Sequence, residues 1–183
     1  MTKVFIGGSR KISKLSADVR HRIDAIIEKH LSVIVGDANG ADKAVQYYLQ
    51  SQGYDQVEVF CAGGQCRNNL GRWPVRAVSA AGQRRGFSFY AAKDRVMAEE
   101  ATVGLMIWDG GSVGTLMNML RLIRQQKAVV VYVAPVKAFE ELHAEDGLDS
   151  LVSRYAPELR ERLERESVSE ERSADEPRQA SLV

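Results

Sequence analysis

The sequence predicts an α/β fold in which a mostly parallel sheet carries helices on both faces. Short apolar runs alternate with amphipathic segments along most of the chain, and several of the runs end directly in glycine-rich turns. Parallel strands need crossovers that pack back on the sheet, so this alternation favours helices on both faces. With 183 residues, the chain supplies one domain and a tail.

The first unit begins with a strand predicted at residues 3–6, which ends abruptly in Gly7-Gly8-Ser9-Arg10. A helix is expected over 16–30, because apolar residues recur there at helical spacing. Ser16 can accept a hydrogen bond from a free N–H group in the first turn of this helix. The unit is therefore predicted as strand, tight turn and capped helix.

The second unit repeats this order. The apolar run at 31–35 is closed by Gly36-Asp37-Ala38-Asn39-Gly40, and helical spacing resumes from Ala41. Gly53 stands where a left-handed C-terminal cap would end the second helix.

Three further runs extend the predicted sheet. Residues 56–61 form a third strand, and 103–108 form a fourth that opens into Asp109-Gly110-Gly111-Ser112-Val113-Gly114-Thr115. An amphipathic helix is expected over 116–126. The β-branched run at 128–133 is typical of a strand covered on both faces.

Residues 63–89 break the alternation, and we interpret them as a basic insertion that forms a lid or a mobile loop. From Gly64 to Arg95, seven cations oppose the single carboxylate of Asp94; they are Arg67, Arg72, Arg76, Arg84, Arg85, Lys93 and Arg95. Such a segment is usually a solvated loop, from which one or two arginines could reach a ligand.

The C-terminal part is predicted as an appendage to a domain that spans residues 1–136. Residues 137–165 form a helical extension, in which Pro157 kinks the helix or starts a new one. Residues 166–183 are polar and rich in Ser, Glu and Arg, and are predicted to be disordered.

Composition excludes several classes of protein. Lys and Arg number 25 against 24 Asp and Glu, so the chain as a whole lacks the charge of a general nucleic-acid binder. The longest apolar stretch, 128–136, is far shorter than the roughly 20 residues that cross a bilayer, and the start does not resemble a signal peptide; we expect a cytoplasmic protein without membrane contacts. Cys61 and Cys66 are expected to be reduced thiols, and neither a metal nor a cofactor is predicted.

The three glycine-rich turns all follow the C-terminal ends of predicted strands. In an open parallel sheet these ends lie along one edge, so turns that are distant in sequence can meet in one crevice. Glycine lets backbone N–H groups approach a ligand, and helices that begin after the second and third turns direct their positive dipole ends toward it. Such a crevice suits a phosphate group.

The candidate ligand-binding residues lie in or directly after these turns, and no catalytic residue is assigned. The residues expected to hold phosphate are Gly8, Ser9, Arg10, Gly110, Gly111, Ser112, Gly114 and Thr115, and those expected on the sugar or base are Asp37, Asp42 and Asp109. Gly36 and Gly40 complete the second turn. Structural alternatives stay open, because any turn needs glycine and because Asp37 and Asp42 can cap the second helix.

Four motifs, in this order, resemble those of the SLOG superfamily, which joins the Rossmann-like domains of the DNA-processing protein DprA and of the Lonely Guy (LOG) phosphoribohydrolases. They are Gly7-Gly8-Ser9-Arg10, Gly36-Asp37-Ala38-Asn39-Gly40-Ala41-Asp42, Lys93-Asp94-Arg95-Val96-Met97 and Trp108-Asp109-Gly110-Gly111-Ser112-Val113-Gly114-Thr115. The YspA-like branch is the most similar. The resemblance covers residues 1–136 and does not reach the tail.

The resemblance implies a Rossmann-like sheet, frequent dimerisation and the binding of nucleotides or nucleotide-derived ligands. LOG enzymes hydrolyse the N-glycosidic bond of a nucleoside monophosphate with a glutamate shortly after the Gly-Thr pair and an arginine before a Lys-x-x-Met-like helix. Here the matching places are occupied by Asn118 and by Lys93 or its neighbours. An asparagine lacks the charge that stabilises an oxocarbenium-like transition state, so this departure weakens the hydrolase interpretation.

The sequence therefore favours a protein that binds a nucleotide or nucleotide-derived small molecule as a sensor or carrier, as a homo-oligomer for which a symmetric dimer is expected. Two alternatives stay open. One is a nucleotide N-glycosidase of the LOG type, and the other is DprA-like binding of single-stranded nucleic acid through the basic segment, which is the less favoured partner.

Overall fold

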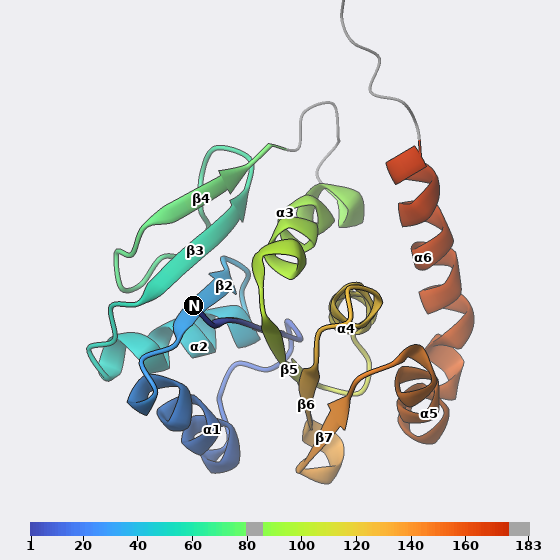
Figure 1. The fold of residues 1–183 in the computed structure, drawn as a ribbon, viewed down its shortest axis with the longest axis horizontal. Helices are drawn as coiled ribbons and strands as arrows, with labels where there is room; N and C mark the ends of the chain where they lie inside the picture. The colour runs from blue at the N-terminus through green and yellow to red at the C-terminus, as the bar shows by residue number, and fades with distance from the viewer. Residues whose placement is uncertain (80–85, 176–183) are drawn as a thin grey trace, which may run out of the picture.

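The core of the fold is a seven-stranded sheet with the strand order β4-β3-β2-β1-β5-β6-β7. It is seen in a computed structural model that describes residues 1–79 and 86–175 (Figure 1). The strands are β1 (Lys3–Gly8), β2 (Ser32–Gly36), β3 (Val57–Ala62), β4 (Val75–Val78), β5 (Val103–Trp108), β6 (Val129–Val133) and β7 (Ala138–Leu142). The strand pairs are parallel except β6 with β7. The predicted α/β fold with a mostly parallel sheet is confirmed.

Helices cover both faces of this sheet. They are α1 (Ala17–Glu28), α2 (Ala41–Ser51), α3 (Phe87–Glu100), α4 (Val113–Arg124), α5 (Glu145–Tyr155) and α6 (Arg160–Asp175), with short 3-10 turns η1 (Ala134–Val136) and η2 (Pro157–Leu159). Figure 1 shows α1 and α2 on one side, and α3, α4 and α5 on the other, with α6 outermost. In the described ranges 1–79 and 86–175, no helix combines the length and the apolar character needed to cross a bilayer.

Alternation along the strands explains the two halves of the core. Successive side chains of a strand point to opposite faces. Val4 and Ile6 of β1 accordingly join the cluster under α1 and α2, whereas Phe5 joins the cluster under α3 and α4. Trp108, which ends β5, is fully buried in the second cluster and forms part of the core.

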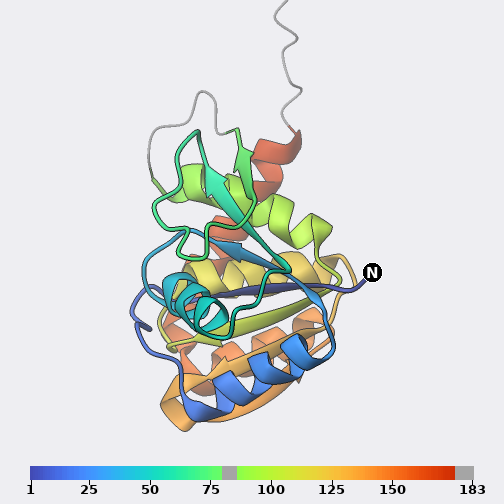
Figure 2. The same ribbon diagram turned by 90° about the vertical axis from the view of Figure 1, so that its left-hand side faces the viewer.

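Local signals that were read from the sequence are present at the helix ends. The Ser16 hydroxyl accepts a hydrogen bond from the Val19 N–H, as expected of an N-cap. Gly53 follows α2 with a φ of +65°, a conformation that glycine adopts without strain. Figure 2 shows β1 running from right to left, so the turn that follows it lies at the left-hand edge.

The basic segment contributes a strand to the sheet, which corrects its interpretation as a lid or mobile loop. Residues 75–78 form β4 at the edge of the sheet, parallel to β3. Arg76 in this strand pairs with Glu58 of β3 and with Glu100 of α3. Arg84 and Arg85 of the predicted insertion lie outside the described residues.

The C-terminal extension differs from the expectation at both ends. It opens with the antiparallel strand β7, and only then continues as α5. Pro157 begins the turn η2, from which α6 continues to residue 175, so residues 166–175 are helical rather than disordered. Glu and Arg are good helix formers, and the helix is held by ion pairs to α4. Residues 176–183 lie outside the described part of the chain.

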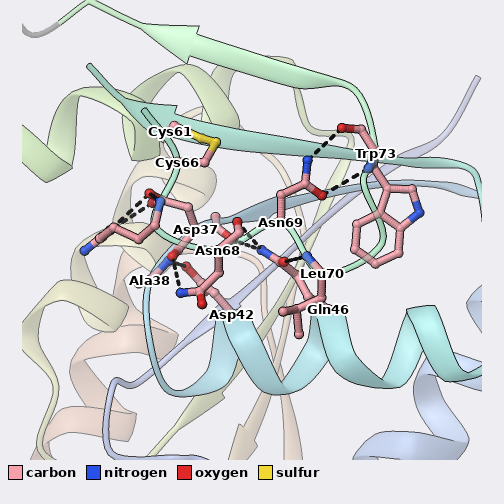
Figure 3. The surroundings of a disulfide bond; sticks show 12 residues. Asp37, Ala38, Asp42, Gln46, Cys61, Cys66, Asn68, Asn69, Leu70 and Trp73 are labelled. Atoms are coloured by element: carbon pink, nitrogen blue, oxygen red, sulfur yellow. Dashed lines mark hydrogen bonds and ion pairs between the residues drawn. A yellow bond between two sulfur atoms is a disulfide. The ribbon is translucent and has the colours of Figure 1, made fainter. Parts of the chain in front are cut away.

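The two cysteines form a disulfide, so the prediction of reduced thiols is wrong for this structure. Their Cα atoms lie 5.2 Å apart, within the span that a disulfide bridges. Cys61 lies near the end of β3, and Cys66 lies in the loop that follows and turns back over it (Figure 3). The bond closes this loop directly before Arg67, which reaches the second glycine-rich turn.

Candidate functional site

A pocket lies at the carboxyl ends of β1 and β5, where the first and third glycine-rich turns meet. Its volume of about 480 Å³ falls in the range of small-molecule sites. Because β1 is paired in parallel with both β2 and β5, the ends of these three strands are adjacent. The predicted ligand residues that line the pocket are Gly8, Arg10, Asp42, Asp109, Gly111, Ser112, Gly114 and Thr115.

The other predicted residues do not line the pocket. For Ser9 the reason is that its side chain faces other protein groups. Its side chain is fully buried, and its hydroxyl lies 3.2 Å from the Thr115 hydroxyl and accepts a hydrogen bond from the Asp109 N–H. These bonds join the turn after β1 to the first turn of α4. Gly36, Asp37, Gly40 and Gly110 are likewise absent from the lining.

Two glycines of the second turn are required by packing. A Cβ atom on Gly36 would lie 2.3 Å from Asp42 Oδ2 and 2.7 Å from Lys93 Nζ. Gly40 has a φ of +88°, and a Cβ there would meet the Arg10 carbonyl oxygen at 2.2 Å. The structural alternative for these glycines therefore explains their presence without a ligand.

The N-terminus of α4 supplies fewer amide donors than expected. Asp109 Oδ1 accepts hydrogen bonds from the Gly111 and Ser112 N–H groups, each at 2.9 Å, so this carboxylate shapes the turn. The Ser112 hydroxyl caps the helix by accepting from the Thr115 N–H. The N–H groups of Val113 and Gly114 come too early in the helix to donate within it, and both residues line the pocket.

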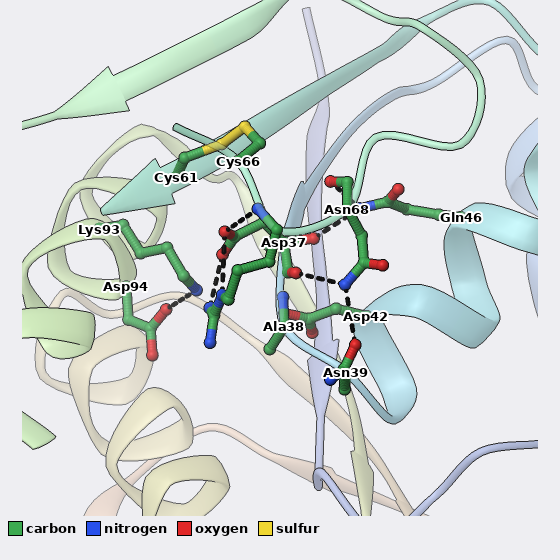
Figure 4. Close-up of polar contacts among 12 residues, drawn as sticks. Asp37, Ala38, Asn39, Asp42, Gln46, Cys61, Cys66, Asn68, Lys93 and Asp94 are labelled. Atoms are coloured by element: carbon green, nitrogen blue, oxygen red, sulfur yellow. Dashed lines mark hydrogen bonds and ion pairs between the residues drawn. A yellow bond between two sulfur atoms is a disulfide. The ribbon is translucent and has the colours of Figure 1, made fainter. Parts of the chain in front are cut away.

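Asp37 is paired with an arginine from the basic segment. Arg67 donates to Asp37 through Nε at 3.0 Å, through a terminal nitrogen at 2.6 Å and through its backbone N–H at 3.0 Å (Figure 4). Burial raises the pKa of Asp37, but the hydrogen bonds from Arg67 and the charges of Lys93 and Arg67 outweigh this, and the pKa falls below its ordinary value. Asp37 thus holds Arg67, which itself lines the pocket and lies 4.2 Å from the Tyr90 ring centre.

A buried lysine joins two carboxylates in the wall of the pocket. Lys93 is 4% exposed and pairs with Asp94 at 2.5 Å. Burial lowers the pKa of Lys93, but Asp94 and Asp42 outweigh it, and the pKa is raised. Burial raises the pKa of Asp42 to about 6 despite the nearby Lys93 charge. For Asp94, burial raises the pKa, whereas Lys93 and Arg121 outweigh burial and lower it.

The part of the pocket wall formed by α3 and α4 was only partly indicated by the sequence, through Asn118 and the motif that contains Lys93 and Asp94. Arg121 of α4 donates to the Asn118 side-chain oxygen at 2.5 Å, and the Asn118 amide donates to Asp94 at 3.4 Å. Helical spacing from Asn118 could have indicated Arg121, because residues three apart share a helix face. Tyr90 and Arg162 also line the pocket and carried no comparable signal.

Among the described residues, no group of three or more His, Cys, Asp and Glu side chains is arranged to hold a metal ion. The polar lining consists instead of cations, carboxylates, one amide side chain and hydroxyl groups. This set can bind an anion through Arg10 and the α4 amides, and can accept hydrogen bonds from hydroxyl groups.

No protein-family model and no curated protein matches the sequence. The X-ray structure of DNA processing protein A (DprA) from Streptococcus pneumoniae is similar in fold, with a TM-score of 0.56 and 18% sequence identity. The match covers 84% of this chain and 56% of that one, so the chain spans little more than half the length of the DprA chain. This chain therefore has an α/β, Rossmann-like fold of the kind that DprA contains.

Proposed function

We propose that this protein belongs to the YspA-like branch of the SLOG superfamily and binds a nucleotide or nucleotide-derived ligand in the pocket, as a sensor or carrier. The observation that supports the proposal is that one pocket contains both the N-terminus of α4, which can bind an anion, and a wall of side chains that accept hydrogen bonds. A phosphate needs the first, and ribose hydroxyls need the second.

The phosphate is assigned to the α4 end. The Val113 and Gly114 N–H groups lie at the positive end of the helix dipole. Arg10, whose side chain is exposed at the turn after β1, lines the same end and can neutralise a phosphate. Asp109 also lines the pocket, and because its Oδ1 already holds two amides of the turn, its other carboxylate oxygen is the one assigned to the ligand.

The sugar and base are assigned to the Lys93 wall and to Tyr90. Asp42, Asp94 and Asn118 offer side-chain oxygens that can accept hydrogen bonds from hydroxyl or amino groups of the ligand. Asp37 is not assigned this role, because it is paired with Arg67. The Tyr90 ring lies at 5.3 Å from the Arg10 guanidinium and 4.2 Å from that of Arg67, so an aromatic surface stands beside the anion-binding groups. A nucleobase can stack on such a surface.

Arg10→Ala is expected to weaken the binding of AMP about tenfold, because a charge-assisted hydrogen bond to phosphate is lost. Isothermal titration calorimetry with AMP and ADP-ribose measures this. Arg20→Ala removes another exposed arginine, on α1, that does not line the pocket, and should leave the affinity unchanged. Native mass spectrometry of the freshly purified protein identifies any retained small molecule.

Two results would contradict the proposal. One is equal AMP affinity in the wild type and the Arg10→Ala variant. The other is binding of oligonucleotides alone, with an affinity that falls steeply with salt, which would favour single-stranded nucleic acid as the partner. Within the described part of the basic segment, Arg67, Arg76, Lys93 and Arg95 each face a carboxylate, which reduces the charge available for a phosphate backbone.

Hydrolysis of an N-glycosidic bond is the second candidate, favoured by the two carboxylates in the pocket. Their surroundings move the pKa of Asp42 up and that of Asp94 down, which is the usual division between a general acid and a charged group. Water would add to the sugar carbon as the bond to the base breaks. Asp42 would protonate the leaving base and then take up the proton that the added water loses, while Asp94 stabilises the positive charge on the sugar.

If the protein is this hydrolase, Asp94→Asn is expected to reduce release of adenine from AMP at least a hundredfold. Chromatography of the released base measures the rate, and Glu99→Gln, an exposed carboxylate of α3, is the control. If the wild type releases no base from AMP, ADP-ribose or NAD, the hydrolase function is contradicted and only the binding function remains.

A further inference from the structure

We propose that Arg121 is a second anion subsite of the pocket, and that Glu170 of α6 is an internal occupant which an anionic group of the ligand replaces. The inference rests on the proposed function, since it concerns the same pocket. It adds that the ligand carries two separated anionic groups, one bound at the N-terminus of α4 and the other at Arg121.

The contact between Arg121 and Glu170 has the form of a bound anion. Arg121 is 7% exposed and lines the pocket. Its Nε donates to Glu170 Oε1 at 2.8 Å, and a terminal nitrogen donates to Oε2 at 2.5 Å. Two parallel hydrogen bonds from one guanidinium are the geometry with which arginine also binds phosphate.

The positive charges around Arg121 need a negative charge close to them. Arg95 of α3 lies 3.7 Å from the same Glu170 carboxylate, and Arg162 of α6 lines the pocket nearby. Asp94 faces the cluster from α3 and attracts Arg121 at a distance, but its direct ion-pair partner is Lys93, and Asn118 bridges it to Arg121. A buried guanidinium without a counter-charge is strongly unfavourable, so either Glu170 or a ligand must supply that charge.

The helix that carries Glu170 has few buried side chains among those that the structure describes. On the described side chains of α6, Leu163 and Ser167 are buried, whereas Val168 is 44% exposed. Its other ion pair, Glu171 with Arg124, joins partly exposed groups, and such surface pairs contribute roughly 0–1 kcal/mol. Figure 1 shows α6 beside α4, on the side of α4 that faces away from the sheet.

The test compares Glu170→Gln with Glu171→Gln, which removes the neighbouring ion pair outside the pocket. Pyrophosphate is the probe, titrated by calorimetry. We expect Glu170→Gln to bind it about tenfold more tightly than the wild type, because the internal competitor is lost, and Glu171→Gln to bind it as the wild type does. Adding Arg121→Gln to the Glu170→Gln variant should abolish the gain.

Hydrogen exchange gives a readout that does not depend on substitution. Saturating pyrophosphate should raise the exchange of α6 amides in the wild type at least threefold, since the helix loses its anchor on Arg121. Unchanged exchange, or equal affinities in the two Gln variants, overturns the inference.

The experiments can contradict the nucleotide-binding function and the Arg121 subsite independently of each other. If AMP binds to the wild type and weakens with Arg10→Ala, while Glu170→Gln has no effect on pyrophosphate, the pocket function stands and the Arg121 subsite does not. If pyrophosphate binds more tightly to Glu170→Gln in an Arg121-dependent way, while neither AMP nor ADP-ribose binds, the subsite stands and the nucleotide function does not.

Discussion

Replacing Lys93 with methionine is expected to lower the free energy of unfolding by about 3 kcal/mol at pH 7. Methionine fills a similar volume, so the loss reflects charge. Lys93 is buried beside Asp94 and Asp42, and without it both carboxylates stand in a poorly solvated wall with their nearest cation removed. Breaking a buried ion pair on one side leaves the remaining charge uncompensated.

Urea denaturation of the wild type and the Lys93→Met variant measures this loss. Lys43→Met is the matched control, because Lys43 is exposed on α2 and its replacement should change the free energy of unfolding by no more than about 0.5 kcal/mol. The deficit of Lys93→Met should shrink towards pH 4, because the loss of the Lys93 charge lets both carboxyl groups of the variant take up protons more readily than in the wild type. A deficit as small as that of the control would show that the pair contributes nothing to stability.

Asp42→Asn is expected to raise the free energy of unfolding by about 2 kcal/mol at pH 7. Burial raises the pKa of Asp42 in the folded protein to about 6, above its ordinary value of 3.8. Between these two pH values the folded protein binds a proton that the unfolded chain has released, so wild-type stability falls as the pH rises from about 4 to about 6. An asparagine removes that cost, and its side-chain oxygen can still accept the Ala38 N–H.

Urea unfolding at pH 4.5, 5.5 and 7 tests the prediction, since the advantage of the variant should grow along this series. Asp149→Asn, an exposed carboxylate of α5, is the control and should show no such trend. Asp37 and Asp94 act in the opposite direction, because their lowered pKa values contribute stability that is lost only as the pH falls below about 4. An advantage that stays constant with pH would contradict the raised pKa of Asp42.

Helices and strands with a strong local sequence pattern were predictable. Those stabilised by contacts with residues far away in the sequence were not. Buried parallel strands are nearly continuous apolar runs, so β1, β2, β5 and β6 were evident from sequence. The edge strand β4 has four residues, of which Arg76 pairs with Glu58 and Glu100. The helix α6 is polar, and its anchor on Arg121 comes from 49 residues away in the sequence. Neither pairing is visible in a local pattern.

The same holds for the charged residues of the site, whose positions were predictable but whose partners were not. The sequence placed Asp37 and Asp109 near a ligand, but Arg67 engages the first and two turn amides engage the second. Lys93 lay in a recognised motif, yet its role as the buried partner of Asp94 required the packing of α3 on the sheet. The Cys61–Cys66 bond likewise depends on how the loop after β3 folds back.

By itself the sequence determined that the turns after β1, β2 and β5 share one edge, because apolar runs separated by helices can form only a few parallel arrangements. Only the tertiary structure decided which groups at that edge remain free to meet a ligand. The reason is physical: a charge pairs with whichever opposite charge folding brings near, and for Asp37 and Arg121 those partners lie on other elements of the fold.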